Sequence, residues 1–150
     1  MASTTFSGPV TSTNGFIGAL TGNIAGTGTI THTPTAINAT ATATAAQVAT
    51  GYITVTSATA VAITLPTGTL LGAALGAVQG TVFDLYIDNT ASTSTGIVTM
   101  VVATNGILST AAADTPGSFG DLTVAVGATG IGRFTLMFSS ATAYVFTRTA

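Results

Sequence analysis

The stretch from residue 64 to residue 89 constrains the fold more than any other part of the chain. Residues 82–89 alternate between apolar and polar side chains. Successive side chains of a strand face opposite ways. One face then carries Phe83, Leu85 and Ile87, and the other carries Asp84, Tyr86 and Asp88. The stretch therefore predicts a strand whose apolar face is core and whose acidic face turns to solvent or to a sister subunit.

Short runs rich in β-branched and aromatic residues recur along the rest of the chain, and Gly-rich turns separate them. They are 52–56, 60–65, 97–102, 122–126, 132–138 and 142–148. The first two flank three small residues and predict a hairpin, and the nearly continuous apolar content of 97–102 predicts a strand buried on both faces. Seven or eight such strands predict an all-β fold, an antiparallel β-sandwich or jelly-roll.

One short helix is expected to interrupt the strands. Thr67 can cap a segment of residues 69–78, in which Leu71 and Leu75 recur at helical spacing. Gly72 and Gly76 weaken this helix, because each costs about 1 kcal/mol relative to alanine.

Residues 1–46 are rich in Thr, Ala and Gly and carry few large side chains. A flexible tail is one interpretation. An extended arm, ordered by contact with another subunit, fits better with the scarcity of charge and the many β-branched residues. Residues 39–46 read as a linker into a β-domain of residues 47–150. The side chains of this arm that are expected to make its contacts are Phe6, Val10, Phe16, Ile17 and Ile30.

Only 4% of the residues are charged, and the chain has no Lys and no Glu. Ordinary globular proteins carry roughly 25% charged residues and rely on them to stay apart. A surface of Thr, Ser and Ala suits packing against copies of the chain or against a partner. Two arginines are too few for nucleic-acid binding. Apolar runs approaching 18 residues are missing, which excludes a membrane-spanning helix, and the lack of cysteine excludes disulfides.

The residues offer little for catalysis. Asp84 and Asp88 share a strand face, but four residues of strand separate them by about 13 Å, and glycosidase carboxyls lie roughly 5 to 9.5 Å apart. Both are better interpreted as solvated charges or as ion-pair partners of Arg133 or Arg148. Asp88 with Asn89 as a calcium site is a weaker alternative.

His32 is the only histidine in the chain, and it is expected at a surface or an interface. One imidazole without a thiolate does not make a metal site. The sequence therefore predicts no catalytic residue, no metal and no cofactor, and a protein that is not an enzyme.

Threonines at alternate positions in residues 29–35 and 40–44 suggest a further possibility. Such residues would form a row of hydroxyls and methyls on a strand, a feature suited to an ordered surface such as ice or a crystalline polysaccharide. A solenoid built from such rows needs one fixed period, and these rows do not have one.

Two groups of residues carry a resemblance to virion proteins of tailed bacteriophages. The block 63–66 (ITLP), a short apolar segment and 80–89 (GTVFDLYIDN) resemble a strand–segment–strand pattern of such proteins, and 132–134 and 143–146 match its later strands. This similarity covers residues 47–150. Residues 3–17 (STTFSGPVTSTNGFI) also resemble N-terminal segments of phage structural proteins.

The family that this resemblance implies is the small head decoration, or cement, proteins. These are β-sandwich or jelly-roll proteins, usually trimeric, that bind outside the capsid. The implied partners are the major capsid protein and two further copies of the chain, and the implied location is the outer capsid surface after synthesis in the host bacterial cytoplasm. A subunit interface is expected at Asp84, Tyr86, Asp88 and Arg133. A fibre-associated or receptor-binding phage protein that contacts host glycan, and a non-viral ice binder or adhesin, remain as alternatives.

Overall fold

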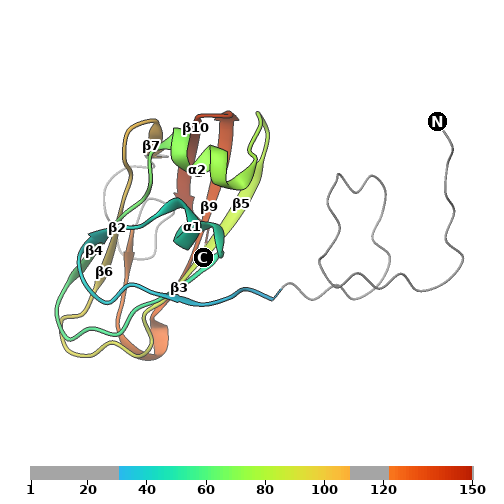
Figure 1. Ribbon diagram of the computed structural model, residues 1–150. Coiled ribbons are helices and arrows are strands. Elements are labelled where there is room, and N and C mark those ends of the chain that lie inside the picture. The colour runs from blue at the N-terminus through green and yellow to red at the C-terminus, as the bar shows by residue number, and fades with distance from the viewer. Residues whose placement is uncertain (1–30, 109–121, 150) are drawn as a thin grey trace, which may run out of the picture. The chain divides into compact units, whose positions relative to one another are not determined.

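The structure, a computed structural model, describes residues 31–108 and 122–149 and shows a mostly β protein with two sheets (Figure 1). The six-stranded sheet has the order β1-β3-β5-β9-β10-β7, and the four-stranded sheet has the order β2-β4-β6-β8. The strands are β1 (Thr35–Ala36), β2 (Ala41–Thr42), β3 (Tyr52–Thr54), β4 (Val61–Thr64), β5 (Val82–Asp88), β6 (Val98–Val101), β7 (Gly106–Leu108), β8 (Thr123–Val124), β9 (Ile131–Ser140) and β10 (Ala143–Arg148).

The chain alternates between the two sheets as it advances. Strands β1, β3 and β5 are parallel neighbours in one sheet, and β2, β4 and β6 are parallel neighbours in the other. Three successive strand pairs are thus stacked in levels, and helix α1 (Ala45–Ala49) and helix α2 (Gly68–Leu75) follow the first and second pairs. Antiparallel pairing is confined to β5–β9, β9–β10 and β6–β8.

This topology corrects two expectations. The all-β class is confirmed, but the sheets are mixed and do not form an antiparallel jelly-roll. The predicted hairpin of residues 52–65 is wrong, because β3 and β4 belong to different sheets. A short connection of small residues permits a hairpin without requiring one. Here residues 55–60 lead the chain from the six-stranded sheet to the four-stranded sheet.

One hydrophobic core joins the inner faces of both sheets. In β5 the alternation places Leu85 and Ile87 inside, fully buried, while Phe83 is only half-buried. The neighbouring strands β9 and β10 contribute the largest side chains, and the rings of Phe134 and Phe146 stack 5.0 Å apart. The opposite sheet contributes the buried residues Val61, Ile63, Val98, Met100 and Val124.

Helix α2 confirms the predicted helix but ends sooner than expected. Thr67 caps its N-terminus by accepting a hydrogen bond from the amide of Leu70, and Gly76 ends it in the left-handed conformation (φ 59°). Gly72 lies against the β9–β10 turn, where a Cβ atom would come within 1.9 Å of the Ala141 carbonyl oxygen. The glycine that weakens this helix in isolation is therefore the one that lets it pack.

The segment 31–46, expected as the end of an arm and a linker, contains ordered elements in the structure. Strands β1 and β2 add to the two sheets, and Ile37 and Ala43 are buried in the core. Helix α1 begins in this segment with a capping box, in which Thr44 accepts from the Gln47 amide and the Gln47 side chain accepts from the Thr44 amide. The compact unit that contains both sheets begins at Thr31.

Strand β6 differs from its expectation as well. Val98 and Met100 are buried, whereas Thr99 and Val101 are exposed, so this strand is covered on one face only. The strands expected in 122–126, 132–138 and 142–148 are confirmed as β8, β9 and β10. Within the described residues, no helix is both long enough and apolar enough to span a membrane.

Candidate interaction surface

The outer face of the six-stranded sheet gathers three of the four described charged residues. Strand pairing sets Asp84 of β5 opposite Thr135 of β9, and Tyr86 opposite Arg133. The Arg133 guanidinium pairs with the Asp84 carboxylate at 2.5 Å and lies 5.9 Å from the centre of the Tyr86 ring. The Thr135 hydroxyl donates to the other Asp84 oxygen at 2.7 Å. The expected ion pair of an aspartate with Arg133 is thus confirmed.

Asp88 has its own set of donors at the end of β5. The Tyr52 hydroxyl donates to one carboxylate oxygen at 2.8 Å. The amide and the hydroxyl of Thr90 donate to the other oxygen at 3.0 and 2.6 Å. Strand register sets Tyr52 opposite Tyr86. Together Tyr52, Asp84, Tyr86, Asp88 and Arg133 form one surface, called here the polar cluster.

The hydrogen bonds of the polar cluster favour the ionised carboxylates of Asp84 and Asp88 and the neutral phenol of Tyr52. The bond from Arg133 holds the pKa of the Asp84 carboxyl below its usual value, with help from Thr135. The hydroxyl and amide of Thr90, with Tyr52, do the same for the pKa of Asp88. The bond to Asp88 in turn raises the pKa of the Tyr52 hydroxyl. The cluster therefore combines charged Asp84, Asp88 and Arg133 with a neutral Tyr52 donor at neutral pH.

Asp84 and Asp88 share a face, but separate donors hold each carboxylate, so the two do not converge on one substrate or ion. The neighbouring residue Asn89 faces the opposite way and is fully buried, and its amide nitrogen bonds to the carbonyl oxygens of Gly96 and Ala125. Asp88 and Asn89 thus do not converge as calcium ligands. Among residues 31–108 and 122–149, no three His or acidic side chains cluster closely enough to hold a metal.

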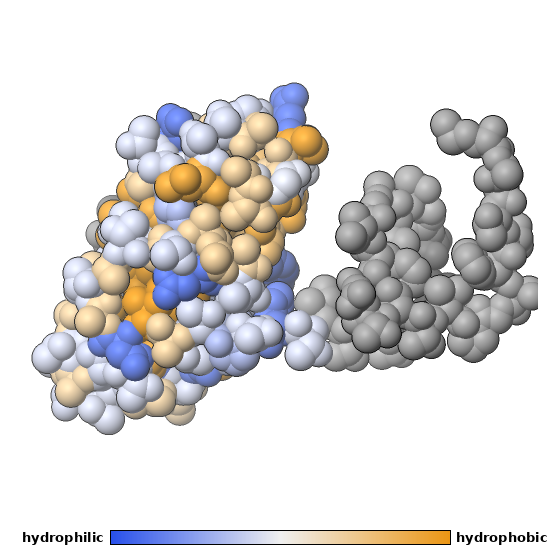
Figure 2. Space-filling model, in the orientation of Figure 1, coloured by the Kyte–Doolittle hydropathy of each residue, from blue (hydrophilic) through white to orange (hydrophobic). Residues whose placement is uncertain are grey.

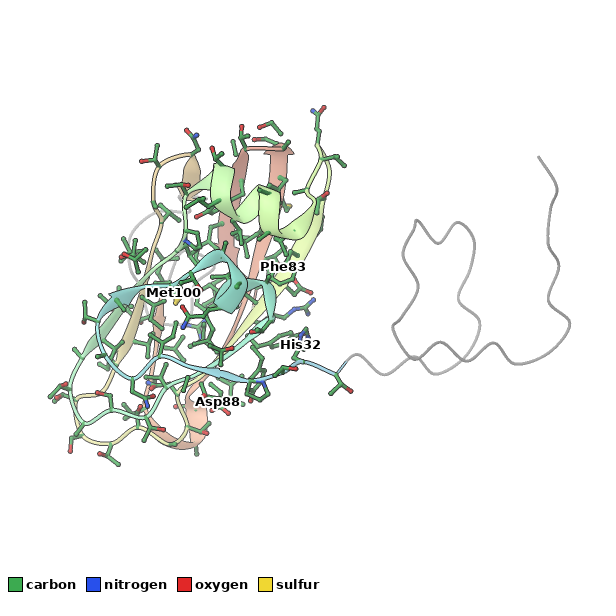
Figure 3. The ribbon with its side chains drawn as sticks, viewed as in Figure 1. His32, Phe83, Asp88 and Met100 are labelled. Atoms are coloured by element: carbon green, nitrogen blue, oxygen red, sulfur yellow. The ribbon has the colours of Figure 1, made fainter. Side chains whose placement is uncertain are left out.

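His32 anchors the chain to this outer face just before β1. Its Nδ1 lies 2.8 Å from the Thr50 carbonyl oxygen, so this nitrogen carries the proton and donates. The imidazole ring centre is 5.8 Å from that of Tyr86. Gly51 leaves room for the ring, since a Cβ there would lie 2.5 Å from Nδ1. Figure 3 shows His32 on the stretch that leads into the first strand.

An apolar row lies beside the polar cluster on the same face. Met137 of β9 is in register with Val82 of β5 on one side and with Val145 of β10 on the other. Val82 is 62% exposed, Met137 is 43% exposed and Val145 is half-buried. Val78, which precedes β5, is 64% exposed. Large apolar side chains at these exposures suggest a surface that another molecule covers.

The outer face of the four-stranded sheet has a different character. Its pairing sets Thr42 beside Thr64 and Thr99 beside Thr123, with Ala62 and Val101 between them. These positions carry no charge. Figure 2 shows the side of the molecule that carries α1 and α2, where most residues are pale to orange and strongly hydrophilic residues form separate patches.

The structure brings the four expected interface residues Asp84, Tyr86, Asp88 and Arg133 into one cluster. The expected contacts Phe6, Val10, Phe16, Ile17 and Ile30 lie outside the described residues. Sequence reasoning missed Tyr52 as a member of the cluster and His32 as its neighbour. Strand register joins Tyr52 to Tyr86, and a ring contact joins His32 to Tyr86. Contacts between segments more than thirty residues apart leave no local signal in the sequence.

Comparisons of the chain with models of protein families, with curated proteins and with solved structures find no match.

Proposed function

We propose that this protein is a structural component of a bacteriophage virion, a decoration protein that binds the outside of the capsid and stabilises contacts between major capsid subunits. One observation carries the proposal: large apolar side chains share one outer sheet face with a preorganised polar cluster that holds three of the chain's six charged residues. Interfaces between proteins combine such features, with Tyr, Met and Arg enriched among their contacts.

The proposed mechanism is mechanical. The two-sheet domain supplies a rigid face, and the segment of residues 1–30 supplies apolar anchors such as Phe6 and Phe16, which insert into neighbouring subunits. Self-association as a homotrimer would present three such faces together, with Asp84, Tyr86, Asp88 and Arg133 at the contacts between copies. Binding stabilises the assembled shell by mass action, because only the assembled shell presents the site.

Sedimentation with capsids tests this function. Purified protein is mixed with expanded, undecorated capsids built from the major capsid protein that is encoded with it, and the pellet is assayed. We expect saturable co-sedimentation at a fixed ratio to capsid subunits, and an Arg133→Ala variant that remains folded should bind more weakly. A protein that stays in the supernatant while it is folded contradicts the proposal.

The threonine face of the four-stranded sheet favours a second candidate, adsorption to an ordered surface such as ice or a crystalline polysaccharide. Parallel strands set Thr42 and Thr64 side by side at the strand spacing of about 4.8 Å, and Val101 continues this row on the next strand. Inhibition of ice recrystallisation or pelleting with insoluble polysaccharide, lost in a Thr64→Tyr variant, would support this candidate. Neither activity in the wild-type protein would remove it.

A further inference from the structure

We propose that the apolar row, Val82, Met137 and Val145, is the docking surface for residues 1–30 of a second copy of this chain. The inference rests on the structural role proposed above and assigns a partner to one of its surfaces. It concerns contact between copies, so it can be tested without any capsid.

The side chains of the row are apolar, like those of the core, but they lie on the outer face of the sheet. Its three residues come from three adjacent strands, and strand register holds them in one line across the sheet. Val82 and Met137 are 62% and 43% exposed, whereas the alternate residues Phe134 and Leu136 on the same strand β9 are fully buried. Covering an exposed apolar side chain is favourable by roughly 25 cal/mol per Å².

The start of the described chain lies on this same face. Tyr86 points outward from β5, and His32 packs against its ring and bonds to the Thr50 carbonyl. Along β5, four residues separate Tyr86 from Val82, a distance of about 13 Å. The described chain therefore begins beside the outer face that carries the apolar row.

Residues 1–30 have the chemistry that the row requires. They contain no Asp, Glu, Lys or Arg, and their largest side chains include Phe6, Val10, Phe16 and Ile17. Such a segment can cover apolar surface without burying a side-chain charge, which would be costly.

The length of the segment lets it reach a second copy. Thirty residues span up to about 100 Å when extended, several times the distance to the chain's own row. The low formal charge of the chain, −2, offers little repulsion between copies. Exchange of identical segments is a low-cost route to closed, symmetric oligomers.

Disulfide trapping tests the contact in the full-length protein, which has no native cysteine. One preparation carries Phe16→Cys, and a second carries Met137→Cys together with a mass tag. A parallel experiment uses Phe6→Cys in place of Phe16→Cys. The two preparations are mixed, oxidised mildly and separated on a non-reducing gel. We expect at least one pair to give a mixed disulfide dimer, with several-fold more of it than the matched control gives.

The control is Thr99→Cys, an exposed position on the outer face of the other sheet. Equal or absent mixed dimer with Met137→Cys and Thr99→Cys overturns the proposal. The proposal is also overturned if a protein that carries both Phe16→Cys and Met137→Cys forms a disulfide only within one chain. Since capsids are absent, failure here leaves the co-sedimentation result standing, and failure of co-sedimentation leaves this contact standing.

Discussion

Tyr144 is a residue whose role depends on burial. Its side chain projects from β10 and is fully buried, and its hydroxyl donates to the Pro66 carbonyl oxygen at 3.0 Å. Burial raises the pKa of Tyr144 from 10 to about 12, because the phenolate loses its hydration. The folded protein thus favours the neutral phenol more strongly than the unfolded chain does.

This raised pKa predicts a loss of stability in alkali. The contribution of Tyr144 is fully present below pH 10 and disappears as the pH rises from about 10 through about 12. A Tyr144→Phe variant should lose about 1 kcal/mol at pH 8, from the missing hydrogen bond, and should lose less than the wild type between pH 10 and 12. Urea unfolding at a series of pH values measures both. Parallel pH curves for the two proteins would contradict the assignment.

Asp84 gives the opposite pH dependence. Its hydrogen bonds from Arg133 and Thr135 lower the pKa of the carboxyl in the folded state. Its stabilising contribution is therefore present above the unfolded pKa of about 3.9 and is lost as the pH falls through the lower folded pKa. An Asp84→Asn variant should show a flatter fall of melting temperature between pH 5 and pH 2 than the wild type. The exposed position of Arg133 means that the difference is small. A steeper fall in the variant would refute this account.

Among the elements, helix α2 shows how packing can reverse an intrinsic preference. Gly72 is buried where the helix meets the β9–β10 turn, and Ala73 beside it is exposed. In an isolated helix, alanine is better than glycine by about 1 kcal/mol. Here the close approach of the Ala141 carbonyl leaves no room for a Cβ.

We therefore expect both substitutions to destabilise the protein, Gly72→Ala against helix propensity and Ala73→Gly in line with it. Gly72→Ala should lower the free energy of unfolding by about 1–3 kcal/mol through overpacking, despite its better helix propensity. The control Ala73→Gly should lower it by about 0.5–1 kcal/mol, through propensity alone. Urea unfolding of both variants gives the comparison. Stabilisation by Gly72→Ala would show that the helix is not held against the turn as the structure has it.

The elements also show what the sequence reveals and what it does not. Strand β5 and the cap at Thr67 are local features, set by alternation and by a side chain that bonds within its own turn, and both were predictable. The pairing of β3 with β5 and of β4 with β6 was not, because each joins segments more than thirty residues apart. The same limit applies to the polar cluster: Asp84 and Tyr86 lie on one predicted face, while Tyr52 joins them only through register.

At the scale of the whole molecule, low charge and exposed apolar residues predict self-association. A homotrimer is the expected state, so sedimentation velocity at micromolar concentration should give three times the chain mass of 14.6 kDa. A Met137→Asp variant should dissociate toward monomer, because a carboxylate in the apolar row would be costly to cover. The control Thr99→Asp alters the other sheet face and should keep the wild-type mass. A wild-type monomer at these concentrations would contradict the trimer.

We have proposed that this protein decorates capsids. Electron cryomicroscopy of expanded capsids after incubation with the purified protein tests it most directly. The account predicts added density on the outer surface at one repeated lattice position, of a size that holds copies of the two-sheet domain and bridges adjacent capsid subunits. Capsids that remain bare at saturating concentrations of folded protein would contradict it.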